Sequence, residues 1–159
     1  MKTRILALAA AVLALAACEQ SLTVSEQALQ GTWRADEHFH DPGTGPQDAW
    51  AELTFGPGSR YQADYYSYGG YGRAADVLTY HYRAEGEYRL RGDSLDVRLF
   101  RELSQDVQFP ETNFVHTLDG DWQRNGTVAV DGDRLTRRYL TAPADAPELT
   151  IATYTRVQD

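Results

Sequence analysis

The chain has 159 residues, with 15 basic and 23 acidic side chains and a formal net charge of −8. Nucleic acid and anionic lipid surfaces are therefore poor partners for the body of the protein, because like charges repel. The only lysine is Lys2 and the only cysteine is Cys18. The rest of the chain thus lacks the residues for Schiff-base chemistry, for a lysine-containing phosphate loop and for an internal disulfide.

The first 18 residues have the layout of a bacterial export signal. A basic start precedes an apolar run from Ile5 to Ala17, a helix of roughly 20 Å against a hydrocarbon core of about 30 Å. Such a run is too short to span a membrane permanently and is typical of a cleaved leader. The sequence Leu15-Ala16-Ala17-Cys18 resembles the lipobox of bacterial lipoproteins, where residues 1–17 are removed and the cysteine is lipidated. The alternative is an ordinary secretory leader that leaves Cys18 as a free thiol.

The resemblance to lipoproteins implies a membrane anchor and a location. Cys18 would carry a diacylglyceryl group and an N-acyl chain, and two or more chains anchor a protein stably. Glu19 follows, and the absence of an aspartate there favours the periplasmic face of the outer membrane. Residues 18–30 then form a tether with one helical turn, with Ser25 as its N-cap and Gly31 just past its end.

Residues 31–159 have the pattern of one all-β domain. This part of the chain is rich in Tyr, Thr, Val, Leu and Arg, and turn-forming Gly, Asp and Pro interrupt it at intervals of about ten residues. Eight or nine antiparallel strands in sequence favour an up-and-down β-barrel, which has no open edge. Besides two hairpins, we expect strands at 32–40, 50–55, 60–66, 112–118 and 149–157, and loops at Asp41–Gln47, Ser67–Arg73, Ser104–Glu111 and Thr141–Glu148.

The clearest local signal is a hairpin around Gly92-Asp93, where glycine suits the first central position of a type II′ turn. Facing residues then have numbers that sum to 185, so that charged pairs share one face and apolar pairs the other. The expected pairs are Arg89 with Asp96, Glu87 with Arg98, Arg83 with Glu102, Leu90 with Leu95, Tyr88 with Val97, and Tyr82 with Leu103. The same spacing of glycine, aspartate and leucine returns 40 residues later around Gly132-Asp133, which predicts a second hairpin.

Two motifs carry a family resemblance. Gly31-Thr32-Trp33 resembles the Gly-x-Trp signature of lipocalins and related calycins, and the string from Gly86 to Leu95 is similar to one in lipocalin-like domains of bacterial lipoproteins. The resemblance implies a lipocalin-like barrel. It also implies that Trp33 closes one end of the barrel beneath Arg156 of the last strand, through a cation–π contact.

The barrel interior is the first candidate binding site. The inward face of strand 76–91 carries Leu78, Leu90 and three tyrosines, whose rings suit a pocket of mixed polarity but equally suit a filled core. Arg137 is expected inward, opposite Val128, where a guanidinium needs a ligand carboxylate or an interior acid. A bulge or a position at the barrel mouth would instead return Arg137 to solvent. The candidate tyrosines of this strand are Tyr80, Tyr82 and Tyr88.

Two further segments are candidates for recognition. Tyr66, Tyr68 and Tyr71 lie in a Tyr/Gly-rich stretch, the composition of loops that contact proteins or glycans, although a simple linker has the same composition. His38 and His40 are spaced so that both could bind one transition-metal ion. The same spacing also fits two solvent-exposed side chains on the outer face of a strand, so we expect no metal site.

No cofactor motif and no catalytic motif are recognisable, and the Asp-Gly pairs are typical of turns. We therefore expect a non-enzymatic, lipid-anchored envelope protein whose barrel binds a small, partly apolar ligand. The alternative is an envelope interaction or inhibitor module that uses the barrel as a scaffold.

Overall fold

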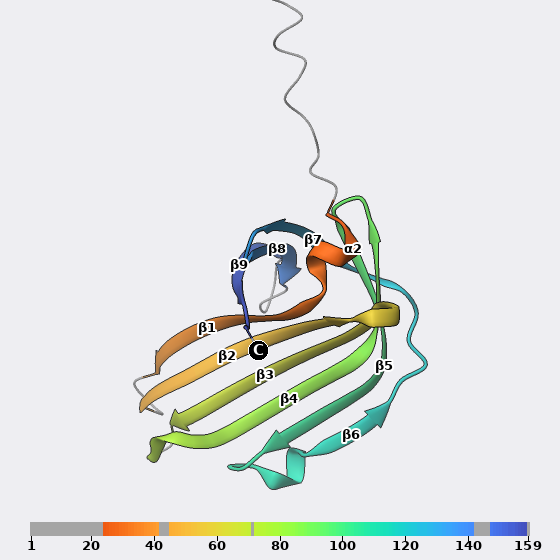
Figure 1. Cartoon of the computed structure of the whole chain (residues 1–159). Coiled ribbons are helices and arrows are strands. Elements are labelled where there is room, and N and C mark those ends of the chain that lie inside the picture. Colours follow the sequence, from red (N-terminus) through yellow and green to blue (C-terminus); the bar gives the residue numbers. More distant parts are fainter. Residues whose placement is uncertain (1–23, 42–44, 71, 142–146, 159) are drawn as a thin grey trace, which may run out of the picture.

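The computed structural model describes residues 24–41, 45–70, 72–141 and 147–158, and nearly all of them lie in strands (Figure 1). One helical turn, α2 (Glu26–Leu29), precedes the first strand, and Ser25 caps it by accepting a hydrogen bond from the Ala28 N–H at 3.1 Å. This helical turn and its cap confirm the sequence prediction. The strands are β1 (Gly31–Asp41), β2 (Gly45–Gly56), β3 (Arg60–Gly70), β4 (Arg73–Arg91), β5 (Ser94–Asp106), β6 (Phe114–Thr117), β7 (Gln123–Asp131), β8 (Arg134–Thr141) and β9 (Glu148–Arg156).

The strands form a closed antiparallel barrel of eight strands with one additional strand outside it. The hydrogen-bonded order β4-β3-β2-β1-β9-β8-β7-β5 is closed by pairing of β4 with β5. Strand β6 pairs only with the second half of β5 and lies outside the barrel (Figure 1). The predicted all-β barrel of eight to nine strands is confirmed.

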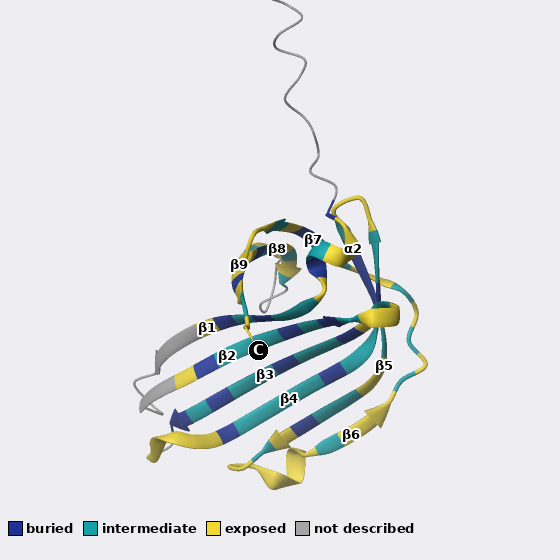
Figure 2. Ribbon diagram, in the orientation of Figure 1, coloured by how far each residue is buried: buried dark blue, intermediate teal, exposed yellow. Residues whose placement is uncertain are grey.

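The core lies at the end of the barrel that holds α2. Along β2 the buried Ala49, Leu53 and Phe55 share one face, because successive side chains point to opposite faces of a strand. In β3 and β4 buried residues occur on both faces, and Figure 2 colours the buried residues dark blue. Beyond β5 the barrel wall consists of β7, β8 and β9. The buried residues of the hydrophobic core are Val24, Leu29, Trp33, Ala35, Leu53, Phe55, Tyr61, Tyr88, Leu95, Val97, Val128, Leu135 and Tyr154.

Both predicted hairpins are present. Gly92 has a φ of +68° and Gly132 a φ of +55°, as the first central position of a primed turn requires. In β4 and β5, the pairs from Arg91 and Ser94 up to Gly86 and Leu99 keep the predicted register.

Beyond Gly86 the predicted register is wrong by one residue. A bulge in β5 shifts the pairing so that Glu85 faces Arg101, Arg83 faces Leu103 and Tyr82 faces Ser104. Glu102 therefore moves to the same face as Tyr82. The bulge reverses which side chains of the second half of β5 point into the barrel.

Glycine allows a close backbone approach at this bulge, and a second glycine allows a similar approach between β7 and β8. A Cβ on Gly86 would lie 2.0 Å from the carbonyl oxygen of Arg98. A Cβ on Gly126 would lie 2.1 Å from the carbonyl oxygen of Arg138. Gly126 follows Gly86 by 40 residues, and Arg138 follows Arg98 by 40 residues. The 40-residue repeat in the sequence therefore corresponds to a repeated backbone contact.

Strands β7, β8 and β9 join the other strands through two short seams near the α2 end. The β1–β9 seam consists of Trp33 opposite Arg156 and Arg34 opposite Thr155. The β5–β7 seam covers residues 94–97 and 123–127. Away from these seams β9 diverges from β1, and the barrel widens toward its other end (Figure 1).

Some predicted loops and strands differ in the structure. Residues 67–70 continue β3 and residues 104–106 continue β5, so the loops expected there are shorter. The strand expected at 112–118 is only β6 and does not enter the barrel wall. The predicted leader, Cys18 and the first part of the tether lie outside the described residues.

No helix in the described part of the chain is both long enough and apolar enough to cross a membrane.

Candidate functional site

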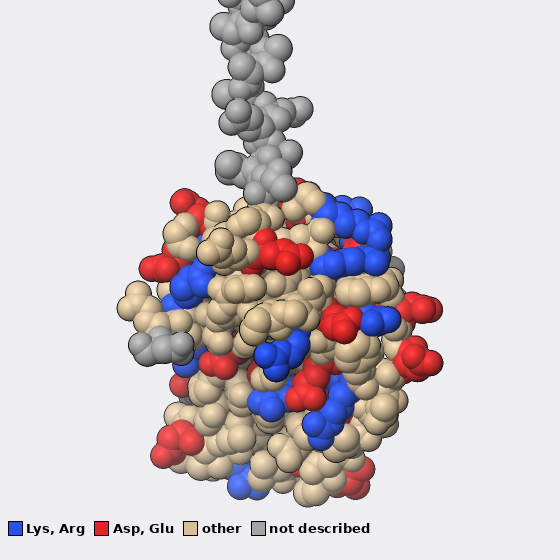
Figure 3. All heavy atoms as spheres, turned by 45° about the vertical axis from the view of Figure 1, so that its right-hand side comes forward, with Lys and Arg blue, Asp and Glu red and all other residues tan. Residues whose placement is uncertain are grey.

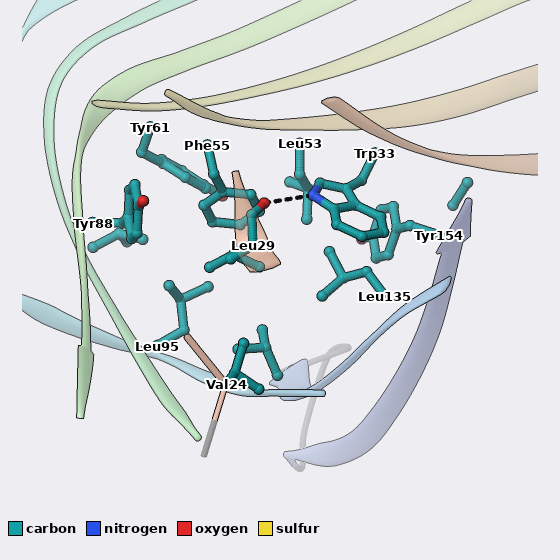
Figure 4. Packing of buried hydrophobic residues seen from close by; sticks show 13 residues of the cluster. Val24, Leu29, Trp33, Leu53, Phe55, Tyr61, Tyr88, Leu95, Leu135 and Tyr154 are labelled. Carbon is teal, nitrogen blue, oxygen red and sulfur yellow. Dashed lines mark hydrogen bonds between the residues drawn. The ribbon is translucent and has the colours of Figure 1, made fainter. Parts of the chain in front are cut away.

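The α2 end of the barrel is closed by three interacting groups. Trp33 is fully buried, and its Nε1–H donates to the Leu29 carbonyl oxygen at 2.7 Å (Figure 4). The guanidinium of Arg156 lies over the Trp33 ring, 4.0 Å from its centroid. Its Nη2 also donates to the Ala28 carbonyl at 2.8 Å, and its Nη1 donates to the Gln30 carbonyl. Arg156 and Trp33 thus satisfy the carbonyl groups at the end of α2, which closes this end of the barrel.

Gly31 is required at this closure for two reasons. Its φ of +122° lies in a region that residues with a side chain rarely adopt. A Cβ there would also lie 2.7 Å from Nη1 of Arg156. The Gly-x-Trp motif therefore combines a backbone requirement with the ring that Arg156 covers.

The open end has a different lining. The registers of β2, β3 and β4 place Ala51, Tyr65 and Tyr82 in one row across the inner face, and Ala49, Ser67 and Tyr80 in the next. Small side chains thus alternate with tyrosine rings on the wall that leads out of the core. The rings of Tyr65 and Tyr80 contact each other, with centroids 6.1 Å apart, and the tyrosine hydroxyls give the wall a mixed polarity.

A carboxylate faces these tyrosines because of the β5 bulge. The Tyr82 hydroxyl donates to Oε1 of Glu102 at 2.7 Å. Burial and then this hydrogen bond raise the pKa of the Tyr82 hydroxyl above its ordinary value. The sequence prediction placed Leu103, not Glu102, opposite Tyr82, and so missed this polar pair.

The second half of the open end is a pocket of about 500 Å³ at the rim. Register places Arg137, opposite the buried Val128, on the inner face, whereas Leu140 and Leu149 face each other on the outside. Because residues from both faces line the pocket, it lies across the rim, at the open end of β7 and β8. Its lining consists of Arg124, Asn125, Gly126, Thr127, Arg137, Arg138, Tyr139, Leu140 and Leu149. We call it the rim pocket.

The three arginines of the rim pocket form no ion pair with any described residue. Most other arginines are paired, and acidic and basic side chains lie interspersed on the face shown in Figure 3. The Arg137 Nε–H donates to the Asn125 carbonyl at 3.2 Å, and its guanidinium lies 4.1 Å from the Tyr139 ring centroid. In addition, Oδ1 of Asn125 is buried and accepts no hydrogen bond from the described residues.

The charge of Arg137 acts inside the barrel. Burial raises the pKa of Tyr61 to about 12, Arg137 opposes that rise, and Tyr154 adds to it. The sequence left two positions open for Arg137, one inside the barrel and one at its mouth. In the structure Arg137 lies at the rim, on the inner face and partly buried.

The structure does not bring the predicted ligand-binding residues together. Tyr80 and Tyr82 line the open end, but Tyr88 is 1% exposed, packs edge-on against Phe55 and belongs to the core at the other end. Tyr66 and Tyr68 lie in β3 on the outer face, and Tyr71 lies outside the described residues.

Tyr66 and Tyr68 belong to an outer-face cluster that spans four strands. Arg34 lies over Trp50, Trp50 stacks on Tyr68 at 4.4 Å, and Tyr66 stacks on His81 at 4.5 Å. The alternation of strand residues could have placed these side chains on one face, but only the register shows that they form one row.

A buried carboxylate holds this cluster in place. Asp64 accepts hydrogen bonds from Gln62 at 2.6 Å, His81 at 2.8 Å and Arg83 at 2.7 Å. Burial alone would raise the pKa of the Asp64 carboxyl, but these three donors outweigh burial and lower it. His81 is thus oriented by Asp64.

Within the described residues, no three histidine, cysteine or acidic side chains are grouped so as to hold a metal ion. The side chains of His38 and His40 are outside the described set.

The geometry defines the class of protein as an eight-stranded antiparallel β-barrel, consistent with a lipocalin-like barrel. No protein-family model matches the chain, and a search of curated proteins finds no relative.

Proposed function

We propose that the protein binds a small ligand with an apolar body and an anionic group at the open end of the barrel. The observation that supports this proposal most is the rim pocket, where three arginines that pair with no described carboxylate adjoin Tyr139, Leu140 and Leu149. Arginine suits carboxylate and phosphate groups because its planar donors bind two oxygens at once. The aliphatic side chains and the tyrosine-lined inner face accommodate the rest of the ligand. The role is one of binding rather than catalysis.

A titration with three probes of equal chain length tests the charge preference. Decanoate, decanol and decyltrimethylammonium differ in head group but share a similar tail, and calorimetry on the purified protein measures each Kd. We expect decanoate to bind at least about tenfold more tightly than decanol, which corresponds to about 1.4 kcal/mol. Equal binding of all three probes, or tighter binding of the cation, would contradict the proposal.

A pair of variants locates the site. Arg137→Gln removes a charged donor from the rim pocket and should raise the decanoate Kd by about 10- to 100-fold. Arg134→Gln removes the same charge from the same strand outside the pocket, and its Kd should be unchanged. Equal effects of the two variants would place the ligand elsewhere.

We propose further that Cys18 is lipidated and anchors the barrel in the cell envelope, at the periplasmic face of the outer membrane. The lipobox-like sequence Leu15-Ala16-Ala17-Cys18 supports this anchor. Cells fed an alkyne-bearing fatty acid should label the wild-type protein but not Cys18→Ala, and fractionation should move the variant out of the membrane. An unlabelled wild-type protein would refute lipidation.

A second candidate function is an interaction or inhibitor module of the envelope. The outer-face cluster of Trp50, Tyr66 and Tyr68 supports it, because aromatic side chains are enriched at protein interfaces. Cross-linking in cells should then capture a partner that Trp50→Ala loses and Arg137→Gln retains. A partner lost only in Arg137→Gln would instead favour the rim pocket.

A further inference from the structure

Within the described part of the chain, most of the β9 edge that faces β1 is unpaired, and it lies next to exposed apolar side chains. Among the described residues, β9 pairs with β1 only at Thr155 and Arg156, although the strand begins at Glu148. The part from Leu149 to Thr153 has β8 on one side and no described strand on the other. Exposed strand edges of this kind readily pair with another chain.

Hydrogen bonds at the end of β9 show which backbone groups point to this edge. The Arg156 N–H donates to the Asp133 carbonyl on the β8 side at 2.9 Å, and the Val157 N–H donates to the Thr32 carbonyl on the β1 side at 2.8 Å. Because the direction alternates along a strand, Leu149, Ile151 and Thr153 direct their N–H and C=O groups to the open edge.

Three side chains on the outer face of β8 and β9 are apolar and exposed, beside Arg138, which lies opposite Ile151. Leu140 of β8 is 70% exposed, and Leu149 and Ile151 of β9 are 65% and 57% exposed. Leu140 and Leu149 face each other across the two strands, with Ile151 next along β9. Adjacent exposed aliphatic side chains of this size indicate a contact surface more than isolated ones do.

Several residue types that usually protect a strand edge from pairing are absent from this part of β9. From Leu149 to Thr155 the sequence has no proline, no glycine and no charge, and most of its residues are β-branched or aromatic. The outer faces of β8 and β9 between Arg134 and Thr155 also carry no carboxylate. On a chain with a net charge of −8, this face is therefore one where two copies approach without repulsion between acidic groups.

We propose that two copies of this chain associate through their β9 edges, as antiparallel strands with the two Ile151 residues opposite each other. In this register Leu149 of each copy faces Thr153 of the other, so all three residues that point to the edge find backbone partners. The arrangement is self-complementary, as a two-fold dimer requires. Registers centred on the neighbouring residues pair fewer of these groups. A centre at Thr150 sets Thr153 opposite Pro147, which has no N–H, and a centre at Ala152 sets Leu149 opposite Thr155, which already pairs with Arg34. The two Ile151 side chains and their leucine neighbours become one shared apolar surface.

Variants of the full chain that each carry one cysteine in addition to Cys18 test the register. Facing residues of a hydrogen-bonded antiparallel pair have Cα atoms about 5.5 Å apart, within the range that a disulfide spans. Under mild oxidation we expect Ile151→Cys to form a covalent dimer by itself. Leu149→Cys and Thr153→Cys should form none separately, but should form one when mixed. Wild type, with Cys18 alone, is the control; a dimer from Thr153→Cys alone would overturn the register.

Light scattering of the uncross-linked protein tests the association itself. Ile151→Lys places a charge at the centre of the pairing and should abolish the dimer, with circular dichroism showing that the barrel remains folded. Val115→Lys is the matched control, since Val115 is 58% exposed on β6 and should leave the dimer intact. If the wild-type protein stays monomeric up to about 1 mM, its dimer Kd is too weak for a specific association, and the proposal is refuted. Ile151 does not line the rim pocket, so decanoate binding by Ile151→Lys keeps this test separate from that of the proposed ligand.

Discussion

Removing the side chain of Arg156 should destabilise the barrel more than any other exchange of a single arginine for alanine. Its side chain is 27% exposed and joins the last strand to the C-terminal carbonyls of α2 and to the ring of Trp33. A hydrogen bond that involves a charged group contributes about 1.5–3 kcal/mol. A cation–π contact contributes about 0.5–2 kcal/mol. The contact with Asp133, at 3.5 Å and largely in solvent, adds little.

Allowing for partial exposure and for water that replaces the guanidinium, we expect Arg156→Ala to lower the free energy of unfolding by about 2–4 kcal/mol. Arg156→Lys keeps the charge but cannot reach two carbonyls at once, and should lose about half as much. Urea unfolding monitored by tryptophan fluorescence measures both variants. The matched control is Arg134→Ala, an exposed arginine without an ion pair to a described residue. If the loss for Arg156→Ala were below about 1 kcal/mol, or equal to that for Arg134→Ala, this account of the closure would be refuted.

Three further outcomes can be measured on the same protein. Trp33→Phe keeps the ring but removes the N–H that binds the Leu29 carbonyl, and should cost about 1–3 kcal/mol in urea unfolding; a loss no larger than for an exposed site would contradict the role of that bond. The lowered pKa of Asp64 stabilises the folded state above the ordinary carboxyl value, and this contribution is lost as the pH falls through the lowered pKa. Asp64→Asn should therefore be less stable at pH 7 and depend less on pH below about 4, whereas Asp36→Asn, which breaks an exposed pair, should follow the wild type. Gly86→Ala should cost about 1–3 kcal/mol or more because its Cβ would overlap the Arg98 carbonyl, and Gly92→Ala, with open space around it, should cost less; equal losses would show that the bulge relaxes freely.

The strand pattern and the turns were predictable because they depend on local chemistry. Alternating side chains predicted the strands, and Gly92 and Gly132 predicted turns with a positive φ. The helical turn before β1 followed from Ser25 and Gly31 in the same way. These features need only the residues within one element.

The composition of the open end was not predictable, because it depends on one extra residue in β5. Glu102 reaches Tyr82 only through the bulge, and the prediction assumed an unbroken register. The only residue-level sign was the glycine at position 86, whose close backbone contact resembles that of Gly126. The Tyr/Gly-rich segment was likewise expected to be a loop, but pairing with β2 and β4 makes it the end of β3.

The contact between Trp33 and Arg156 was expected from the resemblance to lipocalins, whereas the sequence by itself determined the all-β class and the two hairpins. It could do so because side-chain alternation and turn propensity act over a few residues. The tertiary structure alone decided where the barrel closes, which face each half of β5 presents, and that Arg124, Arg137 and Arg138 share one pocket. Those features depend on how strands far apart in the sequence pair and twist, and on where two short seams allow the barrel to open.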